Sequence, residues 1–195
     1  MKRIITISRE FGAAGSTIGM KVAERLGYEY YDKAVILRAA RDSYIDVPTF
    51  QKMDERVPGH LGLAQTLFDF YNRPLNDALF QAQKKVVRSY GDKGSCVIVG
   101  RNAGDILREY DGSLHVFITA QMYWRVQNLK SLMPEESEAR IMDRIRDVDK
   151  MRRKYCSYYT NTEFGQASYY DLCLSASRLG VEKCVDLICQ LAMED

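Results

Sequence analysis

The residues best suited to chemistry stand near the amino terminus, in a glycine-rich stretch between a β-branched run and a helical pattern. A strand, a glycine-rich loop and a helix in this order form a phosphate site, because loop N–H groups and the positive end of the helix dipole converge on the anion. A hydroxyl at the start of such a helix can bind Mg²⁺, and Ser16 and Thr17 are the candidate metal ligands. The predicted phosphate cradle consists of Gly12, Ala13, Ala14, Gly15, Ser16 and Thr17.

This loop fits the phosphate-loop pattern GxxxxGK[ST] only in part. In one register Arg9 stands at the first glycine and Gly15 at the lysine; in another, Glu10 stands at the first glycine and Ser16 at the lysine. Neither register supplies the lysine, whose ammonium group neutralises the β/γ-phosphates during transfer. The loop therefore predicts anion binding and leaves turnover open. A tight strand–helix turn without a ligand is the alternative.

A second candidate is the basic helix predicted over residues 134–155. Arg146, Lys150 and Arg153 recur at i, i+4 and i+7, which places three cations on one face. Like charges at this spacing repel, and the phosphates of ATP would relieve that repulsion. We predict a lid whose arginines substitute for the missing lysine. The alternative is a solvated face with Asp149–Arg153 and Asp143–Arg146 ion pairs.

These candidates need a scaffold, and short apolar runs alternate with helical patterns along the chain. Strands are predicted at 3–8, 28–31, 96–99, 114–119 and 172–175. A first helix carries Ile18, Val22 and Leu26 and ends at Gly27. Further helices are predicted at 33–41, 74–90 (Gly91 just past its end), 121–130, 134–155 and 180–193. This alternation indicates an α/β fold with a parallel sheet of about five strands, covered by helices on both faces.

Composition limits the function classes. The 195 residues predict a single domain with a helical insertion at 42–73 and a lid-like helical region at 131–160. The net charge of +2 and the lack of aromatics interleaved with the basic row argue against a nucleic-acid partner. No apolar stretch approaches the roughly 18 residues of a membrane span, and no signal peptide is visible. We expect a cytoplasmic protein without a membrane partner, and five cysteines without a CxxC pair predict buried thiols.

Several segments together resemble the cytidylate-kinase-like family of nucleoside monophosphate kinases. They are ISREFGAAGSTIG, YEYYDKAVI, CVIVGRNAGDIL, HVFITAQMYWR, DVDKMRRKYC and YYDLCLSASRLG, and the resemblance runs from Ile7 to about Ile188. It implies a three-layer P-loop NTPase-type fold with a nucleoside-monophosphate-binding insertion and a lid. It also implies ATP and Mg²⁺ as cofactors and a CMP-type acceptor. In this branch of the family a loop of the ISREFG type replaces the usual lysine.

The resemblance assigns roles to residues after the second and third strands. Arg101 would grip the acceptor phosphate with both nitrogens, or else be a surface arginine. Asn102 stands where true cytidylate kinases carry the Asp of Gly-Arg-Asp. Asp105 would take part of that role, or pair with Arg101 or Arg108. Asp32 would orient an acceptor hydroxyl or a metal-bound water, or cap the helix that follows it.

The resemblance places four further arginines on the donor side. Arg125 is similar to an arginine near the donor nucleotide, and an exposed helix residue is its alternative. Arg146 is expected on the donor phosphates. Arg152 and Arg153 are expected, with Arg101 and Arg125, as the catalytic cations on the transferring phosphoryl group.

Two other functions stay open. A nucleotide-binding regulatory protein with a degenerate phosphate loop would explain the absent lysine. An NAD-dependent Rossmann oxidoreductase would use Asp32, which lies 20 residues beyond Gly12, to hold a ribose. However, the glycines at 12, 15 and 19 do not form G-x-G-x-x-G. The expected partners are a nucleotide and a small-molecule phosphate acceptor, and self-association into a homo-oligomer is compatible with the sequence.

Overall fold

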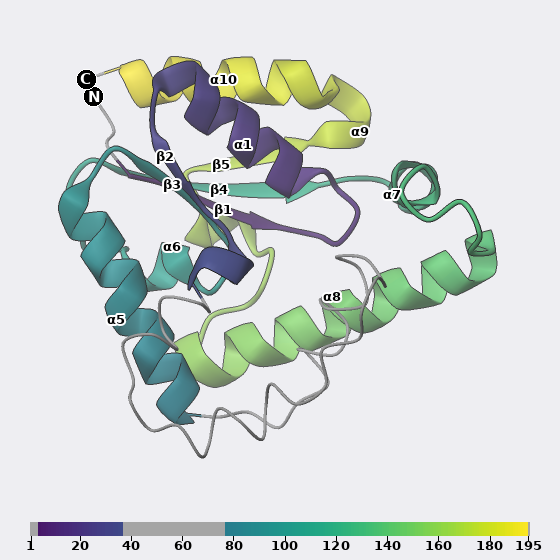
Figure 1. Cartoon of the computed structure of the whole chain (residues 1–195), viewed down its shortest axis with the longest axis horizontal. Helices are drawn as coiled ribbons and strands as arrows, with labels where there is room; N and C mark the ends of the chain where they lie inside the picture. Colours follow the sequence, from purple (N-terminus) through teal and green to yellow (C-terminus); the bar gives the residue numbers. More distant parts are fainter. Residues whose placement is uncertain (1–3, 37–76, 195) are drawn as a thin grey trace.

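The computed structural model describes residues 4–36 and 77–194, and its centre is a parallel sheet (Figure 1). In the described residues five strands pair in the order β2-β3-β1-β4-β5, and every pair is parallel. The strands are β1 (Ile4–Arg9), β2 (Glu29–Tyr31), β3 (Cys96–Val99), β4 (Ser113–Thr119) and β5 (Leu172–Ser175). The predicted fold class and all five predicted strands are confirmed, with ends that differ by at most one residue.

Helices cover both faces of the sheet, as Figure 1 shows. On one side α1 (Gly15–Leu26) lies beside α10 (Val181–Met193), next to α9 (Ala176–Leu179). On the other side lie α5 (Asp77–Lys93), α6 (Ala103–Ile106) and the long α8 (Glu138–Thr160). Helix α7 (Met122–Lys130) follows β4, and the 3-10 helix η1 (Ala167–Tyr169) precedes β5. The central strands β1, β3 and β4 are largely apolar because both of their faces are buried, whereas the edge strands β2 and β5 are partly exposed.

The alternation of side chains along the strands builds two separate cores. Ile5 and Ile7 of β1 pack with α1 and α10, whereas Ile4 faces α5 and α6 together with Ile98 of β3. A third cluster joins α7 and α8 around Phe11, which lies in the turn after β1. This third cluster sets the position of the turn that the sequence predicts as a phosphate site.

Helix α5 runs further than predicted. It continues through Gly91 to Lys93, and the left-handed residues Gly94 (φ 69°) and Ser95 (φ 49°) follow its end. A Cβ on Gly91 would lie 2.7 Å from Leu107 Cδ2, so this glycine permits close packing and does not stop the helix. The prediction that Gly91 ends the helix is therefore wrong.

Helix α8 is shifted relative to the predicted range 134–155. The Ser137 side chain accepts a hydrogen bond from the Arg140 N–H (3.3 Å) and caps the start, and Asn161 (φ 54°) follows the end. The predicted apolar stripe is confirmed, because Ile141, Ile145 and Val148 are buried against α7 and Phe11.

Some predictions fall on residues outside the described ranges. The insertion at 42–73 lies there, as does most of the helix at 33–41, of which residues 33–36 are described and helical. Four of the cysteines are buried as expected, and Cys173 is exposed. Within residues 4–36 and 77–194, no helix combines the length and the apolar character that a membrane crossing requires.

Candidate functional site

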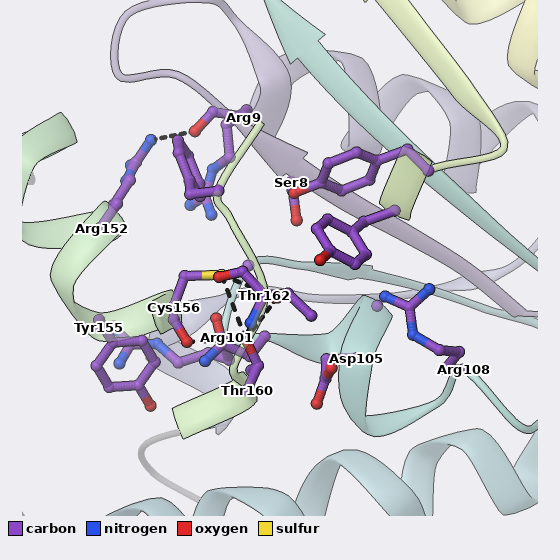
Figure 2. Close-up of a pocket in the computed structure, with 16 residues that line it drawn as sticks. Ser8, Arg9, Arg101, Asp105, Arg108, Arg152, Tyr155, Cys156, Thr160 and Thr162 are labelled. Carbon is purple, nitrogen blue, oxygen red and sulfur yellow. Dashed lines mark hydrogen bonds between the residues drawn. The ribbon is translucent and has the colours of Figure 1, made fainter. Parts of the chain in front are cut away.

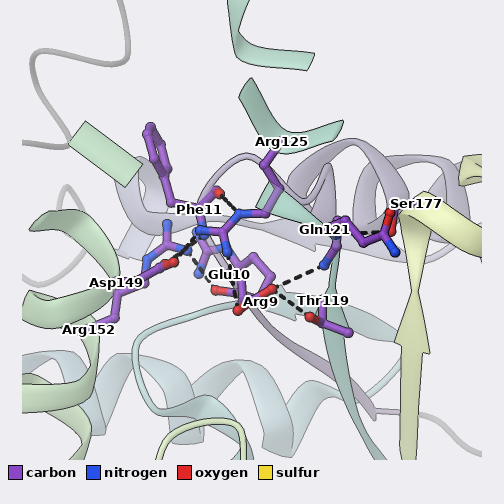
Figure 3. A network of polar contacts seen from close by, with 10 residues as sticks. Arg9, Glu10, Phe11, Thr119, Gln121, Arg125, Asp149, Arg152 and Ser177 are labelled. Atoms are coloured by element: carbon purple, nitrogen blue, oxygen red, sulfur yellow. Dashed lines mark hydrogen bonds and ion pairs between the residues drawn. The ribbon is translucent and has the colours of Figure 1, made fainter. Parts of the chain in front are cut away.

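The turn after β1 is anchored to neighbouring helices through its backbone carbonyl groups. Three of them accept hydrogen bonds from side chains of α7 and α8; Figure 2 shows the bond from Arg152, and Figure 3 shows the bond from Arg125. The bonds run from Arg152 Nη1 to the Arg9 carbonyl (2.6 Å), from Arg125 Nε to the Phe11 carbonyl (2.8 Å) and from Asn128 Nδ2 to the Gly12 carbonyl (2.9 Å). Because a trans peptide directs N–H opposite to C=O, the Gly12 N–H points away from Arg125.

A buried charge network completes this support (Figure 3). Arg125 forms an ion pair with Asp149, and its Nη1 lies 3.2 Å from Glu10 Oε1. Asp149 in turn accepts the Phe11 N–H at 2.8 Å, and Glu10 accepts from Thr119 at the end of β4. All three guanidinium nitrogens of Arg125 therefore bind the loop or its supporting carboxylates. Arg125 lies behind the turn and is 4% exposed, so it is not the exposed helix residue of the alternative.

The start of α1 has the features of an anion site. Ala14 is left-handed (φ 59°) at the N-cap and offers no side-chain cap, and the first turn of the helix contains no acidic residue. Ser16 and Thr17 are exposed there. An uncapped N-terminus leaves helix N–H groups available to an anion, and exposed hydroxyls are chemically suited to Mg²⁺. The residues present thus fit a nucleotide's phosphates with their metal ion.

The turn after β3 is more strained than the turn after β1. Gly100 (φ 82°), Arg101 (φ 58°) and Asn102 (φ 54°) are consecutive left-handed residues. Such a conformation costs about 1–3 kcal/mol for a residue with a side chain, and such residues cluster at functional sites. Arg101 is buried against Tyr155, whose ring centroid lies 5.7 Å away, and Gln83 Oε1 accepts a long hydrogen bond from it (3.5 Å).

The end of β1 and the turn after β3 meet at a pocket of about 580 Å³, its open mouth included (Figure 2). Its wall comes from the ends of β1 and α8, the turn after β3, and the segment before β5. Its basic residues are Arg9, Arg101, Arg108 and Arg152, and Asp105 is the one carboxylate among its described lining residues. Burial raises the pKa of Asp105, although Arg108 and Lys84 oppose this shift. The pocket therefore favours an anionic ligand. The aromatic residues in its wall are Tyr155, Phe164, Tyr169 and Tyr170.

The structure gathers part of the predicted site. Arg101, Asn102, Asp105 and Arg152 line the pocket together. The predicted cradle at 12–17 lies at the start of α1 and is not among the described residues that line this pocket.

Besides Arg125 and the cradle, three predicted residues lie outside the pocket. Arg146 and Arg153 are exposed on α8, and Arg146 pairs with Asp143 at 3.2 Å, as the solvated alternative expected. The other expected pair is wrong, because the partner of Asp149 is Arg125. Asp32 caps the following helix, where its Oδ1 accepts from the N–H groups of Ala34 (2.9 Å) and Val35 (3.1 Å).

Sequence reasoning missed three residues around the pocket. Arg9 and Arg108 line it, and Gln83 supports it from α5, where its Oε1 accepts from Arg101 and from the Tyr155 hydroxyl (3.1 Å). Arg9 carried a signal, since it replaces a glycine in the loop pattern. The sequence offers no comparable signal for Gln83.

The sheet order, the loop and the cationic pocket define a protein with the P-loop kinase fold. A solved but uncharacterized protein from Eubacterium ventriosum is similar, with a TM-score of 0.78, 22% identity, and coverage of 98% of this chain and 99% of that chain. A shikimate kinase from Bacteroides thetaiotaomicron has a TM-score of 0.55 at 14% identity, covering 96% and 97%. A gluconokinase from Sinorhizobium meliloti has 0.51 at 13%, covering 98% and 94%.

The sequence comparison is more specific than these structural likenesses. The family model described as "Cytidylate kinase-like family" matches residues 4–178, and the chain belongs to this family. No curated protein matches the sequence. The family confirms the resemblance that the motifs carried.

Proposed function

We propose that the chain is an ATP-dependent kinase whose acceptor carries its own phosphate group, as a nucleoside monophosphate does, with CMP as the first candidate. One observation carries this proposal: the end of β1, which leads into the loop at the start of α1, and the turn after β3 border one pocket that is lined by four arginines. Transfer between two phosphate-bearing reactants needs two neighbouring anion sites in a fixed orientation. Membership of the family supports the same class of reaction.

On the donor side, the segment 12–17 would bind the phosphates of ATP through backbone N–H groups. Ser16 or Thr17 would hold Mg²⁺, which neutralises phosphate charge when bound. The network of Arg125, Asp149 and Arg152 would keep the loop in one conformation before the nucleotide binds. A loop that is already ordered loses less conformational entropy on binding.

On the acceptor side, Arg101 would bind the acceptor phosphate, since a guanidinium forks over two oxygens. The side-chain nitrogen Nδ2 of Asn102 is buried and makes no hydrogen bond within the described residues, so it can donate to the acceptor. Asp105 would accept from an acceptor hydroxyl or amine. Asp32 caps the helix that follows it. Orienting an acceptor hydroxyl is a second proposed role for its carboxylate.

A second candidate function has one observation in its favour. Gly15 occupies the start of α1, where the phosphate-loop pattern has lysine in one register, so the loop could bind nucleotide without turnover. The chain would then be a nucleotide-binding regulatory protein in the cytoplasm.

A ligand panel separates these functions. Thermal shifts are measured with ATP–Mg²⁺, GTP–Mg²⁺, NAD and a set of nucleoside monophosphates, and ADP release is followed by a coupled assay. The kinase predicts stabilisation by ATP–Mg²⁺ and ADP release that depends on a monophosphate. Stabilisation without turnover would favour the regulatory protein. A thermal shift with NAD alone would contradict both functions and favour the NAD-dependent oxidoreductase.

A further inference from the structure

The loop after β1 departs from the phosphate-loop pattern at two positions that are spatially linked. Helix α1 starts at Gly15, and Ala14 before it is left-handed (φ 59°), a conformation that glycine adopts most easily. This favours the register in which residue 14 matches the second glycine of GxxxxGK[ST] and Gly15 matches the lysine. In the same register Arg9 replaces the first glycine. Relative to this pattern, position 9 has gained a cation and position 15 has lost one.

The Arg9 side chain occupies the space that a side chain at position 15 would need. A Cβ on Gly15 would lie 2.6 Å from Arg9 Cβ and 2.7 Å from Arg9 Cγ. The backbone of β1 fixes the Cβ of Arg9, so this atom cannot move aside as the tip of a flexible side chain could. An arginine at position 9 therefore requires glycine at position 15.

The head of Arg9 reaches the other turn. A Cβ on Gly100 would overlap Arg9 Nη1, and would lie 3.2 Å from Arg9 Cζ. Arg9 is 9% exposed and lines the pocket (Figure 2). Its side chain thus runs from the start of α1 to the turn after β3, between the proposed donor and acceptor sites.

We propose that Arg9 is a catalytic residue that contacts the transferring phosphoryl group and supplies the charge that a lysine supplies in the usual loop. This inference rests on the proposed function. In the transfer, an oxygen of the acceptor phosphate bonds to the γ-phosphorus, and the bond from that phosphorus to the bridging oxygen breaks. The electron pair of the broken bond leaves on ADP. A dianionic acceptor phosphate has no proton to lose. The guanidinium binds two phosphoryl oxygens where an ammonium is a point charge.

The test is an exchange of the two residues. R9A is expected to lower kcat about 100-fold, a loss typical of removing one group that stabilises the transition state. It is also expected to weaken the binding of tripolyphosphate–Mg²⁺ about tenfold, measured by titration calorimetry. G15K alone is expected to lower the thermal unfolding midpoint, because the new side chain overlaps Arg9. The double variant R9G/G15K is expected to regain the midpoint and part of the kcat that R9G loses.

Two matched controls accompany the exchange. E24K adds a lysine to the exposed side of α1 and is expected not to rescue R9G, and R140A removes an exposed arginine of α8 without effect. Wild-type kcat in R9A would overturn the proposal, as would equal rescue by E24K. Equal tolerance of G15K with and without R9G would overturn the spatial linkage. If the wild type transfers phosphate to no acceptor but binds tripolyphosphate through Arg9, the proposed kinase function fails and the Arg9 contact stands.

Discussion

The turns after β1 and β3 leave neighbouring parallel strands and share left-handed backbone, yet they use arginine in opposite ways. In the first turn, Arg125 approaches from α7 and binds a backbone carbonyl and two carboxylates. In the second turn, Arg101 is part of the strained backbone itself and lines the pocket. Proximity to a strand end therefore does not decide whether an arginine serves the fold or a ligand. For Arg125, the partners of its three guanidinium nitrogens show a role in holding the loop.

The largest expected effect concerns the first turn. Asp149→Ala would deprive the buried Arg125 of the more buried of its two carboxylates and remove the acceptor of the Phe11 N–H, at a cost of about 3–5 kcal/mol in the free energy of unfolding. On the same helix, Asp143→Ala breaks an exposed pair and should cost less than about 0.5 kcal/mol. Urea unfolding measures both. Asp149→Asn keeps one oxygen for Phe11 and should fall between them; equal losses at the two aspartates would contradict the structural role of the network.

The next effect concerns the second turn. Arg101→Ala should raise the acceptor KM about 10–100-fold and leave the KM for ATP unchanged, because a hydrogen bond to a charged group contributes about 1.5–3 kcal/mol. Coupled kinetics at saturating ATP measure this, with Arg140→Ala as the control arginine. An unchanged acceptor KM would remove Arg101 from the site, and a matching rise in the KM for ATP would place it on the donor side.

Substitution of one glycine in each turn compares how tightly the two turns are packed. Gly12→Ala would bring a Cβ to 3.1 Å from the Arg125 carbonyl oxygen and 2.9 Å from Leu129 Cδ1, at φ 82°. Gly100→Ala has the same φ but meets the movable tip of Arg9. We expect losses of about 2 kcal/mol and about 1 kcal/mol in the free energy of unfolding. The order is the prediction, and urea unfolding of both variants checks it; a larger loss for Gly100→Ala would mean that the tip of Arg9 is held rigidly.

The fold was predictable because its signals are local. Apolar runs bounded by glycine defined the strands, and Gly27 ended α1 as expected, with φ 66°. The gathering of Arg101, Asn102 and Asp105 was also predictable in outline, since parallel strands place ligands at their carboxyl ends. Those inferences needed only spacing along the chain.

The rest depended on contacts between distant segments. Arg125 and Leu129 stand four residues apart, so a shared buried face was visible in the helical period, but the partners Asp149 and Phe11 were not. The place of Arg9 in the site was not predicted, because its side chain packs beside Gly15 and Gly100 and the sequence does not show that these two glycines lie next to it. Helix spacing identified the cations of α8 and could not tell the buried Arg152 from the exposed Arg153.

The smallest expected effect compares the carboxylates beside the two turns. Asp149 is buried but compensated by Arg125, whereas burial raises the pKa of Asp105. A pKa above the unfolded value of about 3.9 means that the folded state binds more protons, so stability falls as pH rises through the interval between the two values. Asp105→Asn removes this penalty. It should stabilise the protein at pH 7 by less than about 1 kcal/mol, because the side chain is only partly buried.

The pH dependence identifies the source of that gain. Below the unfolded pKa the wild-type carboxyl is protonated in both states, so the advantage of Asp105→Asn should disappear near pH 3.5, a value chosen below the roughly 3.9 of an unperturbed aspartate. Urea unfolding of both proteins at pH 7 and at the acidic pH measures the difference. A gain of equal size at the two pH values would mean that the amide packs better in the turn and that the charge of Asp105 costs nothing. In that case the carboxylate beside the second turn would be as well compensated as Asp149 is beside the first.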